Sequence, residues 1–474
     1  MSNTITIDPV TRIEGHSKIT IHLDDEGEVS QAQLHITQFR GFEKICEGRP
    51  YYEMPSLMAR ICGICPVSHL VASAKACDDL LAVEVPPTAV NLRRLLNLAQ
   101  LIQSDALSFF HLASPDFLLG MDSPPEKRNL FGLMSSFPEI ARDGIELRKF
   151  GQQIIEELGG SRIHPAWVAP GGVNAPLTPE HRNDMISRIP RALEIMKRTL
   201  AWFKPLALQF PEEVACFSNF PTLYMGLVTP DGDLEHYDGL LRMSDIETGP
   251  VVPDFKPERQ EEFIGEAVED WTYLKFPYFK PMGYPEGIYR VGAMARLHII
   301  RRCGEPLADT ELEEYRSHIK ETPHSGFHYH YARLVEMLFA IERMVRILND
   351  EDILSPRVRS HADPNRLEGI GVSEAPRGTL MHHYKIDENG LMKWANLIIA
   401  TGHNNLAMNR GITQAAKQFL HGGKLSEGML NRIEAVIRAY DPCLSCSTHA
   451  SGQMSLIVTL RSSSGERLDQ LVRE

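Results

Sequence analysis

Apolar residues at helical spacing dominate the middle and the end of this chain. Between residues 90 and 112 they recur every three or four positions, a pattern typical of a helix that is buried on much of its circumference. The same spacing predicts helices over 137–158, 179–204, 329–349 and about 425–440. Helices of this length predict a central bundle.

Alternating apolar and polar positions predict strands in other parts of the chain. Residues 3–38 contain three such segments, which indicate a small antiparallel sheet in an N-terminal region spanning 1–40. Residues 380–386 and 391–399 flank a polar, glycine-containing turn and are typical of a hairpin. Residues 218–292 are rich in Gly, Pro and aromatic side chains, so we expect irregular structure with short strands. The predicted fold class is α+β and predominantly helical, with small peripheral strands.

Composition adds limits to this picture. With 474 residues, 43% hydrophobic and 23% charged, the chain matches an ordinary globular protein with a sizeable core. Its net charge of −13 argues against a nucleic-acid partner, which favours a basic surface. No run of about 18 apolar residues is present, and the first residues lack a signal-peptide pattern. We therefore expect a cytoplasmic protein without a transmembrane segment.

Two Cys-x-x-Cys pairs are the strongest chemical signal. Cys62 and Cys65 lie near the start of the chain, whereas Cys443 and Cys446 lie near its end, 443 − 65 = 378 residues later. One pair alone is a weak signal, because a redox pair, half of a zinc knuckle and chance all produce it. Structural zinc sites usually close a loop of roughly 15–20 residues between pairs, which makes a local knuckle a poor fit. Four converging thiolates suit nickel, iron, zinc or an iron–sulfur cluster.

The residues around the pairs resemble a known family. Arg60-x-Cys-Gly-x-Cys-x-x-x-His69 and Asp441-Pro-Cys-x-x-Cys-x-x-His449 resemble the paired signatures of the nickel–iron hydrogenase large subunit. The resemblance runs from Ile7 to the end of the chain and is closest to the soluble, NAD-coupled branch. It implies reversible heterolytic cleavage of H2 into protons and electrons.

The resemblance also implies a nickel–iron centre at the four cysteines. All four thiolates then bind nickel, and Cys65 and Cys446 also bridge to an iron that carries carbon monoxide and cyanide. Cys62 and Cys443 are then terminal nickel ligands. His69 is expected to fix the bridging thiolate by a contact from outside the ligand set. The four remaining cysteines stand singly and are expected to be small buried apolar residues: Cys46, Cys77, Cys216 and Cys303.

Glu14 is the expected proton relay. It lies in Asp-Pro-Val-Thr-Arg-Ile-Glu-Gly-His, which resembles the N-terminal motif of the family. There this carboxylate lies beside a terminal cysteine and passes protons from the metal site. A carboxylic acid suits a relay because burial can raise its pKa towards neutrality. Without the resemblance, Glu14 is typical of an ordinary turn or surface carboxylate.

Three further residues match the surroundings of the centre. Arg377, in Gly-Val-Ser-Glu-Ala-Pro-Arg-Gly, corresponds to a guanidinium above the open metal position, where it holds charge and donates hydrogen bonds. Asp441 is expected to pair with it, and Thr401 to donate to a cyanide. Alone, Arg377 is typical of a surface residue in a Pro-Gly loop. This chain has Ser104 and then Asp105 where membrane-linked relatives have an acidic residue, so a second carboxylate beside Arg377 stays open.

A second, hard cation is implied by three other positions. Glu43, the backbone carbonyl of Leu397 and His449 match the protein ligands of a magnesium site near the centre. A histidine ligand is less typical of magnesium, so iron or zinc remain alternatives. Taken alone, Glu43 is a solvated charge next to Lys44.

Several histidines lie together in the sequence without cysteines nearby. A zinc site is one interpretation of such groups, and a structural or exposed position is the interpretation that we favour. They are His324, His328, His330, His382 and His383.

The resemblance predicts partners and processing. The chain has too few spare cysteines for an iron–sulfur cluster. Electrons are therefore expected to leave through a small iron–sulfur subunit, followed by diaphorase subunits that carry FMN, iron–sulfur clusters and the NAD site. No Gly-x-Gly-x-x-Gly fingerprint is present for NAD in this chain. A maturation endopeptidase is expected to cut after His449, leaving a domain of residues 1–449 and removing the extension 450–474. Three alternatives are a hydrogen-sensing subunit, a complex I-like subunit without metal, and a structural zinc protein.

Overall fold

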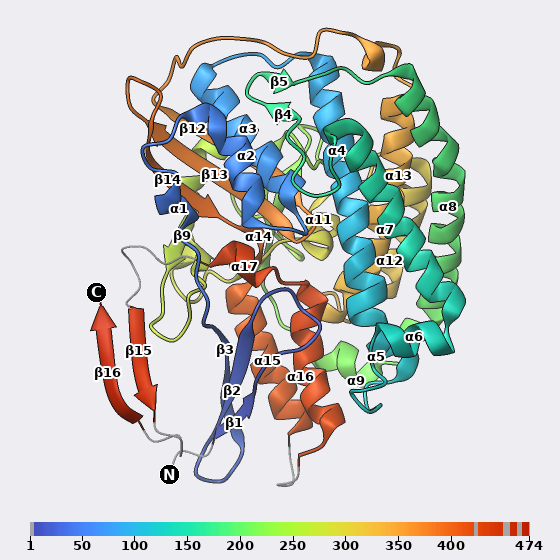
Figure 1. The fold of residues 1–474 in the computed structure, drawn as a ribbon. Coiled ribbons are helices and arrows are strands. Elements are labelled where there is room, and N and C mark those ends of the chain that lie inside the picture. The colour runs from blue at the N-terminus through green and yellow to red at the C-terminus, as the bar shows by residue number, and fades with distance from the viewer. Residues whose placement is uncertain (1–3, 421–424, 449–455, 462–466, 474) are drawn as a thin grey trace.

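A long-helix bundle forms one side of the molecule (Figure 1). The computed structural model describes residues 4–420, 425–448, 456–461 and 467–473, the last two ranges as backbone strands. The bundle helices pack side by side and bury continuous apolar faces. They are α4 (Pro87–Ala106), α7 (Pro138–Gly159), α8 (Pro179–Ala207) and α13 (Tyr329–Leu348).

Shorter helices lie beside the bundle. Two of them, α11 (Ala293–Ile299) and α12 (Pro306–His318), pack against α13. Three others lie at the lower end of the bundle in Figure 1: α5 (Ser114–Leu119), α6 (Leu130–Ser136) and α9 (Pro211–Cys216). The chain passes from α4 to α5 through a π-helical segment, Leu107–Ala113. The helix expected over 90–112 is therefore α-helical only to Ala106, and a wider turn follows.

The N-terminal sheet packs on the C-terminal helices. Strands β1 (Thr4–Ile7), β2 (Ser17–Leu23) and β3 (Val29–Ile36) are antiparallel, as the alternation predicted. Strand β3 lies along α15 (Asn405–Phe419), which packs against α16 (Glu427–Tyr440). Side chains of α15 fix the register, because Asn409 accepts a hydrogen bond from the Leu34 amide at 2.8 Å.

The hairpin expected over 380–399 is part of a three-stranded sheet. Strand β13 (Gly378–Ile386) pairs with β14 (Met392–Ile398), and β12 (Glu368–Ala375) pairs with the other edge of β13. Helix α3 (Pro66–Leu81) lies directly on β12. Gly371 makes this approach possible, because a Cβ there would lie 2.0 Å from the Ala72 carbonyl oxygen of α3. The sheet thus fixes the helix that follows the first cysteine pair.

The remaining elements are short. The segment 218–292 holds the strands β6 (Leu223–Val228), β7 (Leu240–Asp245), β8 (Gly249–Pro250), β9 (Ile264–Ala267), β10 (Phe276–Phe279) and β11 (Tyr289–Arg290), with α10 (Gln260–Phe263) between them. Elsewhere lie β4 (Val168–Ala169), β5 (Gly172–Val173), β15 (Leu456–Arg461), β16 (Arg467–Arg473), α1 (Phe42–Ile45), α2 (Met54–Met58), α14 (Ala400–His403) and α17 (Leu444–Ser447). The α+β fold class with a helical majority is confirmed. No helix among the described residues is long and apolar enough to cross a membrane.

Candidate metal centre

The first cysteine pair sits in a tight turn at the start of α3. The amides of Ile64 and Cys65 both donate to Cys62 Sγ at 3.2 Å. Pro66 is the first residue of the helix, a position where its missing N–H has no cost and its fixed φ suits the helix. The turn therefore presents the Cys62 sulfur with two backbone donors that stabilise a thiolate.

The second pair is held by segments distant in sequence. Helix α16 ends at Tyr440, and the next residue, Asp441, caps it with a left-handed backbone of φ 53°. The Cys443 amide then donates to the hydroxyl of Thr401 at 2.9 Å. The Leu444 amide donates to the Glu14 carbonyl oxygen at 3.2 Å, and Glu14 and Cys443 form an isolated parallel bridge. Cys446 follows on the short helix α17.

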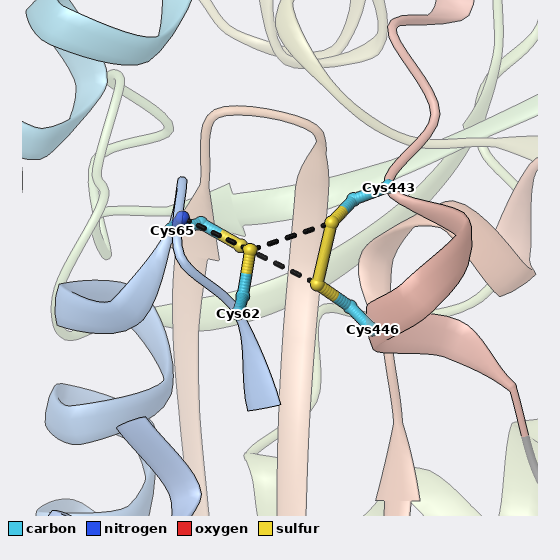
Figure 2. Close-up of side chains that lie close together, drawn as sticks. All are labelled: Cys62, Cys65, Cys443 and Cys446. Atoms are coloured by element: carbon cyan, nitrogen blue, oxygen red, sulfur yellow. Dashed lines mark hydrogen bonds between the residues drawn. A yellow bond between two sulfur atoms is a disulfide. The ribbon is translucent and has the colours of Figure 1, made fainter. Parts of the chain in front are cut away.

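The two pairs meet in one buried cluster (Figure 2). All four sulfur atoms lie within 4.8 Å of one another. Cys62 Sγ lies 3.4 Å from Cys443 Sγ, and Cys65 Sγ lies 3.8 Å from Cys446 Sγ. Four sulfurs placed about 2.3 Å from one tetrahedral metal would be about 3.8 Å apart. The cluster therefore fits a metal of that kind.

The state of the sulfurs matters for that fit. Cys443 and Cys446 are joined as a disulfide (Figure 2), so ligation by all four cysteines requires these two as thiolates. The hydrogen bond with Cys65 lowers the pKa of Cys62, and the Arg377 guanidinium adds to this lowering. A soft, electron-rich donor set of this kind suits nickel and iron.

Arg377 lies in the turn between β12 and β13 and is almost fully buried. Its Nε donates to the Asp441 carbonyl oxygen at 2.6 Å, and its Nη2 lies 3.1 Å from Asp441 Oδ2. The second contact is an ion pair without hydrogen-bond geometry. Its Nη1 donates to the Ser104 hydroxyl at 3.2 Å. The second group beside Arg377 is thus a hydroxyl, and the neighbouring Asp105 faces Arg333 instead, 3.9 Å away.

A further buried cation holds the loop that carries Arg377. The Arg296 guanidinium donates to the Glu374 carboxylate at 2.7 Å and to the carbonyl oxygens of Ala375 and Pro376 at 3.1 and 3.3 Å. Its other nitrogens bond the Glu336 carboxylate at 2.5 and 2.6 Å. No sequence pattern indicates this arrangement, because Arg296 lies 81 residues before Arg377 (377 − 296 = 81) in a segment without a motif.

Glu14 reaches the turn between Cys443 and Cys446. One carboxylate oxygen accepts the Ser445 amide at 3.1 Å, and the other accepts the Ser445 hydroxyl. The side chain is partly buried. Gly15, with φ of 88°, allows the close approach, since a Cβ there would lie 2.8 Å from Leu444 Cβ. The N-terminal motif therefore lies directly against the second cysteine turn.

His69 contacts His382, one of the histidines for which we expected a structural or exposed position. Its Nδ1 lies 3.2 Å from His382 Nε2, and His382 Nδ1 lies 2.6 Å from the Tyr384 hydroxyl. That hydroxyl bonds Ser73 on α3 at 2.8 Å. Burial lowers the pKa of His69 to about 3, so the ring is neutral at pH 7. His382 is fully buried, and the β13 register brings it to His69. Among the described residues, the hydrogen bond of the His69 ring is to His382 and not to a cysteine sulfur, so its expected contact with the bridging thiolate stays a prediction.

Two of the three expected cation ligands lie together. Glu43 Oε1 accepts a hydrogen bond from the Leu397 amide at 2.9 Å. Leu397 pairs with His382 in the sheet, which places this position one strand away from the His69 contact. His449 lies outside the described residues.

The other histidines serve packing and hydrogen bonding. His324 Nδ1 bonds the Tyr224 hydroxyl at 2.9 Å, and His328 Nε2 bonds Thr322 at 3.1 Å. His330 packs edge-on against Phe117, and His383 bonds Glu368. Within the described part of the chain, the cysteine quartet is the only group of His, Cys, Asp or Glu residues with ligand atoms close enough to hold a metal ion.

The chain is similar to known proteins along its whole length. A family described as nickel-dependent hydrogenase matches residues 40–123 and 247–449, and one described as HoxL-like matches residues 4–39. The NAD-reducing hydrogenase HoxS subunit beta of Cupriavidus necator is 40% identical, with 100% of each chain covered. An F420-non-reducing hydrogenase chain of Methanothermobacter thermautotrophicus is 40% identical over 96% of this chain and 97% of the relative. A crystal structure of an NAD+-reducing [NiFe]-hydrogenase in the H2-reduced state superimposes with a TM-score of 0.92 and 44% identity, covering 94% of this chain and 100% of that chain.

Proposed function

This chain belongs to the nickel-dependent hydrogenase large-subunit family, and we propose that its cysteine quartet holds a nickel–iron centre from which electrons pass towards NAD+. The buried quartet carries the proposal, because it joins two pairs from opposite ends of the chain in one cluster of metal-binding size. The similarity to an NAD-reducing hydrogenase subunit over the full chain supports the acceptor. The complex I-like and zinc alternatives lose their basis with the family match.

The residues present fit the expected ligand roles. Cys62 and Cys443 would bind nickel alone, and Cys65 and Cys446 would bridge nickel to iron. When bound, such a centre supplies the redox chemistry for heterolytic cleavage of H2. Thr401 accepts the Cys443 amide with its hydroxyl oxygen, so its own proton would remain available to donate to a cyanide of the bound centre.

Arg377 supplies a fixed positive charge beside the sulfurs. The Asp441 carboxylate and the Ser104 hydroxyl hold the guanidinium, and Arg296 holds its loop. Because Arg377 is 3% exposed, water is largely excluded around it and its field acts at low dielectric. An immobile cation of this kind stabilises negative charge that develops on the substrate side of the centre.

Glu14 is the proposed proton acceptor. Its carboxylate is held by Ser445, which lies between the two cysteines of the second pair. A proton released at the centre moves to a carboxylate oxygen of Glu14, and the neutral acid then passes it on towards solvent. Glu14 is partly buried, which supports a place between the buried quartet and solvent.

We place a divalent cation, Mg2+ or an iron or zinc ion, near Glu43. The Glu43 carboxylate and the Leu397 backbone lie within hydrogen-bonding distance of each other. With His449 they would supply one nitrogen and two kinds of oxygen ligand.

Electrons must leave through other subunits. The single cysteines are all buried and lie outside the quartet, so the described residues offer no ligand set for a cluster. We propose a small iron–sulfur subunit beside the centre, followed by diaphorase subunits with FMN and NAD, in the cytoplasm. The metal-loaded chain alone should fail to reduce NAD+, and a purified chain that reduces it would contradict this path.

We further propose that an endopeptidase removes residues 450–474 after metal insertion. The family match ends at residue 449. The alignment with the Cupriavidus sequence covers the whole of this chain. The superposition with the solved hydrogenase chain covers all of that chain but leaves 6% of this chain unmatched (100 − 94 = 6). Intact mass spectrometry of the active complex tests this, because the large subunit should end at His449. An active complex that keeps Ala450 to Glu474 would refute it.

The central experiment measures metals and activity together. The complex is purified, nickel and iron are counted by mass spectrometry, and H2-dependent NAD+ reduction is assayed. Cys446→Ser should abolish both metal content and activity, whereas Cys216→Ser, at a buried cysteine of α9 outside the quartet, should keep both. Full nickel content and activity in Cys446→Ser would sink the assignment. A hydrogen sensor would bind the metals but would not reduce NAD+.

A further inference from the structure

Buried polar atoms without hydrogen-bond partners lie near Arg377, where the C-terminal part of α4 packs against α13. The residues are almost fully buried, and these atoms find no hydrogen-bond partner within the described part of the chain. They include both carboxyl oxygens of Asp105 and Nε and Nη1 of Arg333. A π-helical segment begins two residues after Asp105, and such wide turns are frequent at functional sites.

Asp105 and Arg333 face each other without direct bonding. Arg333 Nε lies 3.9 Å from Asp105 Oδ1, which is too long for a hydrogen bond. A buried polar atom without a partner is costly, and internal water normally satisfies such groups where several of them converge. A separation above about 3.5 Å between polar groups is typical of a bridging water. The cluster therefore has the polar partners that an internal water needs.

The charged side chains around Asp105 already neutralise one another when Asp105 is left out of the count. Three guanidinium groups, on Arg296, Arg333 and Arg377, lie in this region. Three other carboxylates lie within 3.1 Å of a guanidinium nitrogen: Glu336, Glu374 and Asp441. Asp105 is the fourth carboxyl group, and its nearest guanidinium nitrogen, on Arg333, is 3.9 Å away. The three guanidinium groups and the other three carboxylates already sum to zero, so these seven groups stay neutral in total only when Asp105 carries a proton.

The surroundings of Asp105 favour the same protonation state. Burial raises the pKa of Asp105 well above its ordinary value, and Arg333 offsets this only in part. The charged groups that face it are Arg333 and Glu336 on α13, Arg296 on α11, and Asp441. Both acidic neighbours oppose ionisation of Asp105.

We propose that Asp105 is a neutral carboxylic acid that positions the Arg377–Asp441 pair. It bonds through internal water to Arg333, and the Asp441 carboxylate then interacts with the guanidinium groups of Arg377 and Arg333. An ionised Asp105 would instead draw Arg333 away and repel Asp441. The proposed protonation state is argued from the described side chains alone, whereas the positioning role rests on the proposed function.

Infrared spectroscopy of the purified complex tests the protonation state. The C=O stretch of a protonated carboxyl group shifts in D2O, and Asp105→Asn should remove one such band. Asp143→Asn is the matched control, because Asp143 is also buried but bonds the Arg198 guanidinium through both oxygens. The control should leave the band unchanged. An unchanged band in Asp105→Asn would overturn the proposal.

A pair of variants tests the positioning role. Asp105→Asn keeps a neutral hydrogen-bonding group and should stay close to wild type in H2/D+ exchange and in the infrared bands of the iron ligands. Asp105→Leu has similar size without polar atoms, so it should shift those bands and lower exchange by about 10–100-fold. Equal damage in both variants would show an ionised Asp105, and unchanged bands and exchange in Asp105→Leu would show a merely structural residue. Either result refutes the proposal. Wild-type complex without nickel and iron would instead refute the proposed function and leave the C=O test standing.

Discussion

Replacing Glu14 by Gln separates proton transfer from structure. Glu14 accepts two bonds from Ser445, one from the amide and one from the hydroxyl. A glutamine oxygen can still accept the amide, and its NH2 group can donate to the hydroxyl oxygen once that hydroxyl rotates. Both contacts survive, so we expect the free energy of unfolding to change by less than about 1 kcal/mol.

The effect on turnover should be much larger. An amide cannot take up a proton at neutral pH, so Glu14→Gln removes the proposed acceptor entirely. Positioned acid–base groups typically contribute about 10²–10⁴-fold to a rate, which corresponds to about 2.7–5.4 kcal/mol in the activation barrier. H2/D+ exchange and H2-dependent NAD+ reduction should fall by this factor, while nickel and iron content stays at the wild-type level.

Two further variants sharpen the result. Glu14→Asp keeps an ionisable group on a shorter side chain and should recover part of the lost rate. Ser445→Ala keeps the Glu14 carboxylate but removes the hydroxyl that orients it, so its loss should be smaller than that of Glu14→Gln. Exchange near the wild-type rate in a metal-loaded Glu14→Gln complex would refute the relay and show that protons leave by another path.

Two other outcomes follow from single contacts and from burial. Thr401→Val removes the acceptor of the buried Cys443 amide and should lower the free energy of unfolding by about 1–3 kcal/mol, whereas Thr401→Ser should keep it; equal urea midpoints for Val and Ser would contradict this. Stability should also fall as the pH drops from about 6.5 towards 3, because burial lowers the pKa of three histidines from 6.5 to about 3, so that below 6.5 the unfolded chain binds protons that the folded chain does not. These histidines are His69, His328 and His403. Urea titrations at pH 7.5 and 5.5 measure this loss of stability, and equal urea midpoints at the two pH values would contradict the prediction.

The helical framework could be predicted from the sequence, because the spacing of apolar residues within each segment determines its helix. The apolar spacing over 137–158, 179–204 and 329–349 gives helices within three residues of those bounds at α7, α8 and α13. The turn after Ile386 likewise encodes the hairpin of β13 and β14. The sequence of strand β12 shows no alternation that would predict a strand, because it contains two glycines. Its extended backbone is stabilised by packing against α3 and by pairing with β13.

The quartet could be predicted from spacing, but its surroundings could not. Two Cys-x-x-Cys turns in one chain are typical of a shared metal site, so we expected the four sulfurs to lie together. His382 carries no signal in the sequence, since its contact with His69 depends on the register between two strands and on a helix 313 residues away. Whether Ser104 or Asp105 faces Arg377 depends on how α4 packs against α13. The spacing of residues in the sequence does not determine this packing.

The second cysteine turn has little structure of its own, and this explains why distant residues decide its geometry. Its position depends on the Glu14 carbonyl, the Thr401 hydroxyl and the Arg377 guanidinium, which belong to three separate segments. Each supplies one bond to a backbone group of residues 441–444. A change in any of these segments therefore moves Cys443 and Cys446 relative to Cys62 and Cys65, whose own turn is fixed by two backbone donors and by the packing of α3 on β12. Loss of metal is consequently the expected first effect of damage to the segments, and loss of rate with full metal content marks a residue that acts in the chemistry itself.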